Sequence, residues 1–131
     1  MNNLYLVWNS QDESKYVVGK LFHDEKYYFN YVDPDLSEAK GLGVMTYPGF
    51  AKHDYTYESE TLFPNIKTRL PNKERPDYSV ILSSFDATDT DNDFTILEKT
   101  KGKLLTDRFE FLSENNEFII EFIEKYMQYK K

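Results

Sequence analysis

The sequence predicts an α+β fold in a single domain spanning residues 1–131. We expect a small, curled antiparallel sheet packed by three to five helices, with a long helix at the C-terminus. Short apolar segments separated by polar turns open the chain, which is typical of a meander of antiparallel strands. Later segments carry apolar residues at helical spacing instead. A chain of 131 residues is also long enough to bury one hydrophobic core.

Composition limits what kind of protein this can be. Hydrophobic residues make up 40% of the chain, which excludes a disordered tail, and 11 Tyr, 10 Phe and one Trp predict an aromatic core. A formal charge of −7 argues against direct nucleic-acid binding, which depends on a basic surface. The absence of cysteine excludes disulfides and thiolate metal sites. The N-terminus is too polar for a signal peptide and no apolar run is long enough to cross a membrane, so we expect a cytoplasmic protein.

Three strands are expected near the N-terminus. Leu4 to Trp8 is a compact apolar run, and we expect Trp8 to lie in the core. Lys15 to Phe22 is rich in Tyr and Val, and Gly19 within it indicates a bulge or a close approach to the backbone. Lys26 to Val32 follows a short polar turn. Two hairpins in succession therefore begin the predicted sheet.

The next segment is the least regular part of the chain. Asp33 and Pro34 are typical of a helix start, and Gly41 would end that helix after about two turns. Residues 41–60 have loop composition but retain apolar side chains, and a strand is expected near Asp54 to Glu58. Such a loop either covers the core or is offered to a partner. The candidate partner-binding residues are Met45, Tyr47, Phe50 and Tyr55.

A helical corner at residues 61–77 forms the centre of the predicted architecture. Apolar residues at helical spacing predict a short helix with Pro64 in its first turn and Pro71 at its end. Pro76 can open a second helix immediately afterwards. This corner also gathers positive charge in an otherwise acidic chain, from Lys67, Arg69, Lys73 and Arg75.

Two interpretations of Arg69 and Arg75 are open. As structural residues, they would converge on one side of the helix junction and bind carbonyl oxygens, with Asp77 accepting a hydrogen bond from Arg75. As functional residues, they would bind a phosphate or a carboxylate. We expect the structural role, because arginine can satisfy several acceptors at a helix junction.

Further elements are expected after this corner. Pro76 to Phe85 is amphipathic at helical spacing, and a short helix should run from an Asp93 cap to Gly102. Asp107 to Leu112 alternates polar and apolar residues, as a last strand should. Glu114 to Lys131 is the expected long final helix. Its apolar stripe should pack on the sheet, although a terminal helix could also support a homodimer.

Residues suited to catalysis or metal binding are few. His23 and His53 are the only histidines, and they are far apart in sequence. The carboxylates between Asp86 and Asp93 are spaced like part of a calcium loop, but the required glycine and bidentate glutamate are missing. The sequence therefore predicts no catalytic, cofactor-binding or metal-binding residue, and we do not expect an enzyme.

Several short motifs follow one another in a recognisable order: Val7-Trp8, Val18 to Leu21, Tyr27 to Tyr31, Leu62-Phe63, Arg69 to Pro71, Arg75 to Asp77, and the block from Asp93 to Gly102. In this order they resemble the small domain that precedes the kinase in HipA-type serine/threonine kinases. The patterns R-L-P-N-x-x-R-P-D and T-D-x-F-E-F are most similar to HipA N-terminal-like segments found ahead of HIRAN domains in bacterial proteins. The resemblance covers roughly residues 4–112, and residues 113–131 would form the C-terminal amphipathic helix.

The resemblance implies a regulatory role without catalysis. A stand-alone segment of this kind is similar to HipS, the short antitoxin of a split HipA system, so the implied partner is a HipA-type toxin kinase. The sequence departs from the HipA pattern at Gly43 to Pro48, where only the proline of the L-S-L-S-x-P signature remains. In the split system a tryptophan-bearing loop is thought to reach the kinase site, whereas Trp8 lies in a predicted strand.

Two alternatives to this function are open. The charge of −7 and the clustered aspartates would suit an acidic inhibitor that mimics nucleic acid on a nuclease or a defence protein. The positive corner at residues 67–75 would suit a module that binds phosphate or nucleotide ends.

Overall fold

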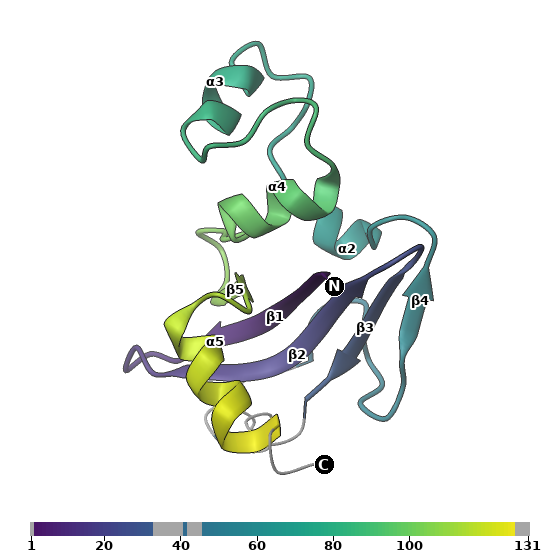
Figure 1. Ribbon diagram of the computed structural model, residues 1–131, viewed down its shortest axis with the longest axis vertical. Coiled ribbons are helices and arrows are strands. Elements are labelled where there is room, and N and C mark those ends of the chain that lie inside the picture. The colour runs from purple at the N-terminus through teal and green to yellow at the C-terminus, as the bar shows by residue number, and fades with distance from the viewer. Residues whose placement is uncertain (1, 33–40, 42–45, 128–131) are drawn as a thin grey trace.

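The computed structural model describes residues 2–32, 41 and 46–127. Within these residues five strands form one open, fully antiparallel sheet in the order β4-β3-β2-β1-β5 (Figure 1). The strands are β1 (Asn2–Asn9), β2 (Lys15–His23), β3 (Tyr27–Tyr31), β4 (Tyr57–Ser59) and β5 (Phe109–Ser113). The predicted α+β class and the meander at the start of the chain are both confirmed.

Several short helices surround this sheet: α2 (Pro64–Lys67), α3 (Tyr78–Ser83), α4 (Asp93–Thr100) and α5 (Glu117–Phe122), the last continuing as a π-helical turn η1 (Ile123–Met127). Figure 1 shows α2 and α4 over one side of the sheet, with α3 beyond α4 and away from the strands. Helix α5 lies on the other side of the sheet. No helix in the described part of the chain combines the length and the apolar character needed to cross a membrane.

The larger core lies between the sheet and helices α2 and α4, and it is strongly aromatic. Phe29 from β3 stacks on Phe50 with ring centroids 4.2 Å apart, and Ile66 and Leu97 close the core from the two helices. Trp8 is buried in the same cluster, as its apolar segment predicts. Burial of these rings supplies much of the hydrophobic stabilisation of the domain.

A smaller core lies on the opposite face, where α5 packs against the sheet. Ile119 and Phe122 are buried there against Tyr5, Val7 and Val17. The apolar stripe of the last helix therefore packs on the sheet, as expected. The alternation of residues along β1 explains why one strand serves both cores, because successive side chains point to opposite faces.

The predicted long C-terminal helix is wrong. Helix α5 begins at Glu117 and not at Glu114, because the Asn116 side chain caps it by accepting a hydrogen bond of 2.9 Å from the Phe118 backbone N–H. Residues before Asn116 form a turn instead. The regular α-helix then gives way to η1 at Ile123. The four residues after Met127 lie outside the described part of the chain.

Gly19 has both properties that its position in a strand predicts. Leu6 pairs with Gly19 and Val7 pairs with Val17, so Val18 is an extra residue that makes a bulge beside the glycine. A Cβ at residue 19 would lie only 2.6 Å from the Phe29 ring. The aromatic core therefore requires a residue without a side chain here.

The boundaries of the central helices differ from the predictions by a few residues. Pro64 occupies the first turn of α2 as expected, but the helix ends at Lys67, before Pro71. Helix α3 begins after Asp77, and among its residues Leu82 is the buried one. The amphipathic pattern predicted a buried apolar face along this helix, and only part of that face is buried. Asn92, not Asp93, caps α4 by accepting a 2.8 Å hydrogen bond from the Thr95 N–H.

Helix α4 ends where the sequence indicates. Lys101 adopts a left-handed conformation with φ of 66°, and Gly102 follows with φ of 59°. Strand β4 overlaps the end of the segment where a strand was expected, near Asp54 to Glu58, and ends one residue later at Ser59. The helix predicted to begin at Asp33 falls almost entirely outside the described residues.

Candidate functional site

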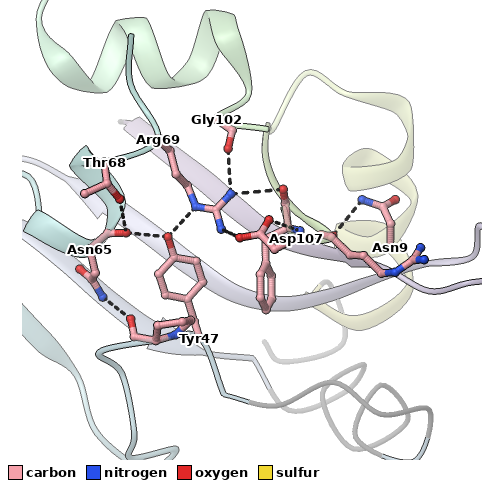
Figure 2. A network of polar contacts seen from close by, with 10 residues as sticks. Asn9, Tyr47, Asn65, Thr68, Arg69, Gly102 and Asp107 are labelled. Carbon is pink, nitrogen blue, oxygen red and sulfur yellow. Dashed lines mark hydrogen bonds and ion pairs between the residues drawn. The ribbon is translucent and has the colours of Figure 1, made fainter. Parts of the chain in front are cut away.

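The corner after α2 places Arg69 in a network of polar contacts (Figure 2). Arg69 is buried, with only 6% of its surface exposed. Its Nε donates a 2.6 Å hydrogen bond to the Tyr47 hydroxyl, and Nη1 donates to the carbonyl oxygens of Gly102 at 2.9 Å and Phe109 at 3.5 Å. Its Nη2 pairs with the carboxylate of Asp107. One guanidinium thus joins the end of α4, the start of β5 and the loop that holds Tyr47.

The same network organises Tyr47. Its hydroxyl donates a 2.8 Å hydrogen bond to the Asn65 carbonyl, which ties the loop to α2. The guanidinium carbon of Arg69 lies 5.1 Å from the centre of the Tyr47 ring, within the range of a cation–π contact. Burial raises the pKa of Tyr47, although the hydrogen bond from Arg69 opposes this shift. Tyr47 is therefore held as a neutral phenol inside the fold.

The donors of Arg69 are nearly all used inside the protein. A guanidinium has five N–H groups, and the contacts above occupy Nε, both hydrogens of Nη1 and one of Nη2. A bound anion would have to displace protein acceptors that are already desolvated. This geometry favours the structural interpretation of Arg69.

Arg75 lies apart from this network. Its exposed side chain pairs through two nitrogens with Asp77, at 3.0 Å and 3.1 Å. The hydrogen bond from Arg75 lowers the pKa of Asp77. The contact expected between Arg75 and Asp77 is thus present, and Arg69 and Arg75 line the same groove, but their guanidinium groups share no acceptor among the described residues. The turn between them leaves one guanidinium buried and the other in solvent.

The candidate partner-binding residues of the irregular loop separate into different environments. Tyr47 and Phe50 are buried in the larger core, so this loop covers the core at these two residues and does not offer them to a partner. Tyr55 is exposed, with its ring 4.7 Å from that of Tyr57. Met45 lies outside the described residues.

A groove of about 340 Å³ lies beside the corner, between the chain after α2, helix α3 and the loop from α4 to β5. Leu70, Pro71, Ile81, Phe85 and Leu104 supply its apolar lining. The cations among its lining residues are Arg69, Arg75 and Lys103. Among the described residues that line it there is no carboxylate. The groove is therefore apolar with a positive edge.

Exposed apolar side chains gather in the elements that form this groove. Phe85 is 43% exposed and Leu104 is 37% exposed, while Val80 on α3 is 69% exposed and Leu105 is fully exposed. The sequence analysis included Phe85 in an amphipathic helix and assigned no role to Leu104 and Leu105. The sequence did contain a signal for Leu104 and Leu105. They are two consecutive leucines in a polar segment whose pattern fits neither a helix nor a strand.

The other cations of the corner are partly neutralised. Lys67 and Lys73 lie 3.9 Å and 3.7 Å from the carboxylate oxygens of Asp93. Lys103 differs from them, since it makes no ion pair with any carboxylate in the described part of the chain. Its charge nevertheless acts on Glu110, whose pKa it helps to lower, while at the groove itself no described lining residue is a carboxylate that could pair with its ammonium group.

A second buried charge lies near the start of β5. Glu110 is buried and accepts hydrogen bonds from Lys15 at 2.6 Å and from Asn9 at 3.0 Å. Burial alone would raise the pKa of Glu110, but the hydrogen bonds from Lys15 and Asn9 outweigh it and hold the pKa below its usual range. The pair fixes β5 to the start of β2.

Metal-binding geometry is not found in the described residues, which contain no group of three or more His, Asp or Glu side chains placed to hold an ion. His23 stacks on Tyr27 with ring centroids 4.0 Å apart, and His53 meets the ring of Tyr31 edge-on. In the acidic segment, Asp91 accepts a 2.9 Å hydrogen bond from the Thr88 backbone N–H, which closes a turn.

Comparison with known proteins adds no relative. The chain matches no family model, and searches of the curated proteins and of the solved structures likewise find no match. The resemblance to HipA N-terminal segments therefore stays a prediction.

Proposed function

We propose that this protein is a non-enzymatic, HipS-like regulatory module that binds a HipA-type toxin kinase. One observation supports a protein partner most directly: the exposed apolar surface around α3 and the loop from α4 to β5. Of the six large hydrophobic side chains exposed among the described residues, four lie there: Val80, Phe85, Leu104 and Leu105. The choice of a HipA-type kinase rests on the sequence motifs.

Physical reasoning favours a partner for this surface. Scattered exposed apolar residues are common, but a cluster on neighbouring elements marks interaction sites. Other apolar residues of these elements already fill cores among the described residues: α4 closes the larger core through Phe94 and Leu97, and α3 packs on α4 through Leu82 and Ile96. The outward side chains of α3 and the loop are therefore available to another molecule.

Co-purification tests the proposal. The tagged protein is co-expressed with the HipA-type kinase encoded beside it, and we expect the kinase to elute with it in a stable complex. A Leu105→Asp variant should lose the kinase while keeping the wild-type melting temperature, because Leu105 is fully exposed. Ile120→Asp on α5 is the matched control and should retain the kinase. A gene without such a neighbour, or a kinase that never co-elutes, would refute the proposal.

A phosphate-binding module is the second candidate, because Arg75 and Lys103 line a groove in which no described residue is a carboxylate. Inorganic phosphate or a nucleotide should then raise the melting temperature of the wild-type protein. A Lys103→Glu variant should lose this stabilisation. A melting temperature that does not respond to these anions would remove this candidate.

A further inference from the structure

We propose that the groove beside α3 receives a short segment of the partner protein in which an apolar side chain lies next to a carboxylate. This inference rests on the proposed function for the existence of a protein partner. It adds where the partner binds and what chemistry it presents there.

The size and lining of the groove fit one or two apolar side chains. Its volume of about 340 Å³ lies at the lower end of the range for ligand pockets. Leu70, at its base, also packs against both the larger core and the cluster of Leu82, Ala87 and Ile96. Phe85 and Leu104 remain exposed at its walls. An inserted leucine or aromatic ring would remove these walls from water, which is how anchor residues stabilise interfaces.

The frame around the groove is held in place before any partner arrives. Arg69 binds the Gly102 carbonyl on one wall at 2.9 Å. The backbone N–H of Phe111 donates a 2.8 Å hydrogen bond to the Lys101 carbonyl, which fixes the start of the loop against β5. A rigid frame lowers the entropy lost on binding.

The positive charge at the groove determines the second feature that we expect of the partner segment, which is a carboxylate. In a chain of charge −7, the groove is edged by Arg75 and Lys103 and has no carboxylate among its described lining residues. Arg75 already pairs with Asp77 through two hydrogen bonds. Lys103 forms no direct ion pair within the described chain, although its charge interacts with that of Glu110. A carboxylate beside the anchor side chain would complement Lys103, while other acidic surfaces of the protein would repel it.

A peptide selection tests this chemistry on the full chain. A phage library of random dodecapeptides is selected on the immobilised protein, and enriched peptides are synthesised for affinity measurements by fluorescence polarisation. We expect enrichment of Leu, Phe or Trp next to Asp or Glu. Lys103→Glu and Leu104→Asp should each weaken binding about tenfold or more. Lys52→Glu and Ile120→Asp, which alter exposed positions on other surfaces, should leave the affinity unchanged.

A charge swap makes the assignment specific. Replacing the acidic residue of a selected peptide with lysine should abolish binding to the wild-type protein and restore part of the binding to Lys103→Glu. Three results would overturn the inference: no enrichment over the Leu104→Asp protein, equal binding to wild type and Lys103→Glu, or full competition by inorganic phosphate, which would indicate an anion site instead.

The outcomes separate this inference from the proposed function. If the HipA-type kinase co-purifies with wild type, Lys103→Glu and Leu104→Asp alike, the groove is not the docking site, although the regulatory role stands. If acidic–apolar peptides bind the groove but no HipA-type kinase does, the inference stands and the choice of kinase fails.

Discussion

Arg69 donates a 2.6 Å hydrogen bond to the hydroxyl of Tyr47, a residue that precedes it by 22 positions. The contact joins the corner after α2 to the loop that covers the sheet. Through its other nitrogens Arg69 also reaches Gly102 and Asp107. Segments that are distant in sequence are thus held by one side chain.

Replacing Arg69 with alanine should destabilise the fold. The substitution leaves the Gly102 carbonyl and the Tyr47 hydroxyl without this donor in a buried environment, and such losses cost on the order of 1–3 kcal/mol. Urea denaturation monitored by circular dichroism should show a lower midpoint. Arg69→Lys should recover little, because one ammonium cannot reach the acceptors that a planar guanidinium spans.

Arg75→Ala is the matched control for this experiment. Its guanidinium is exposed and binds only Asp77 among the described residues, so the midpoint should stay at the wild-type value. If Arg69→Ala kept a normal midpoint but lost partner binding, Arg69 would be a functional residue and our structural interpretation would be wrong.

Gly19→Ala should destabilise the protein through a steric clash. The added Cβ would lie 2.6 Å from the Cζ atom of Phe29, and Phe29 is stacked on Phe50 in the larger core. Overpacking of this kind typically costs about 1–3 kcal/mol. Gly41→Ala is a suitable comparison, since no atom of the described residues lies within 4 Å of its added Cβ. Equal melting temperatures for the two variants would contradict this account.

Tyr31 should make stability depend on pH in the alkaline range. Burial raises the pKa of Tyr31 to about 12, whereas an unfolded tyrosine titrates near 10. The folded state therefore holds the proton more tightly. Its contribution to stability is complete below about pH 10 and is lost as the pH rises through about 12.

Urea midpoints measured across this alkaline range provide the test. Tyr31→Phe should show a shallower fall in stability than wild type, although it starts from a lower value because it loses hydrogen bonds to Phe50 at 2.5 Å and from Tyr47 at 3.0 Å. Tyr55→Phe removes an exposed hydroxyl and should follow the wild-type curve. Parallel curves for wild type and Tyr31→Phe would refute the prediction.

Glu110 should contribute stability that is lost in acid. Hydrogen bonds from Lys15 and Asn9 outweigh burial and hold the pKa of Glu110 below its usual range. The contribution is therefore present above the pKa of the unfolded glutamate, about 4.3, and disappears as the pH falls through the lower folded value. Glu110→Gln should be less stable than wild type at neutral pH and lose less stability on acidification. A larger acid loss in the variant would contradict this.

Local sequence patterns were sufficient for the strands. Alternation and turn chemistry located β1, β2 and β3 to within two residues, and Gly19 indicated both the bulge and the close approach of Phe29. These signals work because each depends on neighbouring residues or on the steric limits of one residue. Helix starts were predicted less accurately. The caps are Asn92 and Asn116, whereas the sequence pattern suggested a cap at Asp93 and a start at Glu114, and several nearby polar residues have similar capping ability.

The site could be predicted only in part. Arginine chemistry indicated a role in binding carbonyl oxygens, and Arg69 does bind those of Gly102 and Phe109. The sequence could not separate Arg69 from Arg75, because both flank the same polar turn and the difference lies in what packs over each of them. The sequence assigned no role to Leu104 for a similar reason. The other apolar residues that line the groove with it include Ile81 and Phe85, which come from a different segment of the chain.

By itself the sequence determined the α+β class, the opening meander and the aromatic core, because periodicity and composition express local backbone preference and burial. The tertiary structure alone decided which arginine is buried, which aromatic residues of the loop cover the core, and that Leu104 meets α3 at a groove. Those outcomes depend on contacts between residues far apart in the chain, such as Arg69 with Asp107. No window of sequence contains both partners, so only the folded chain brings them together.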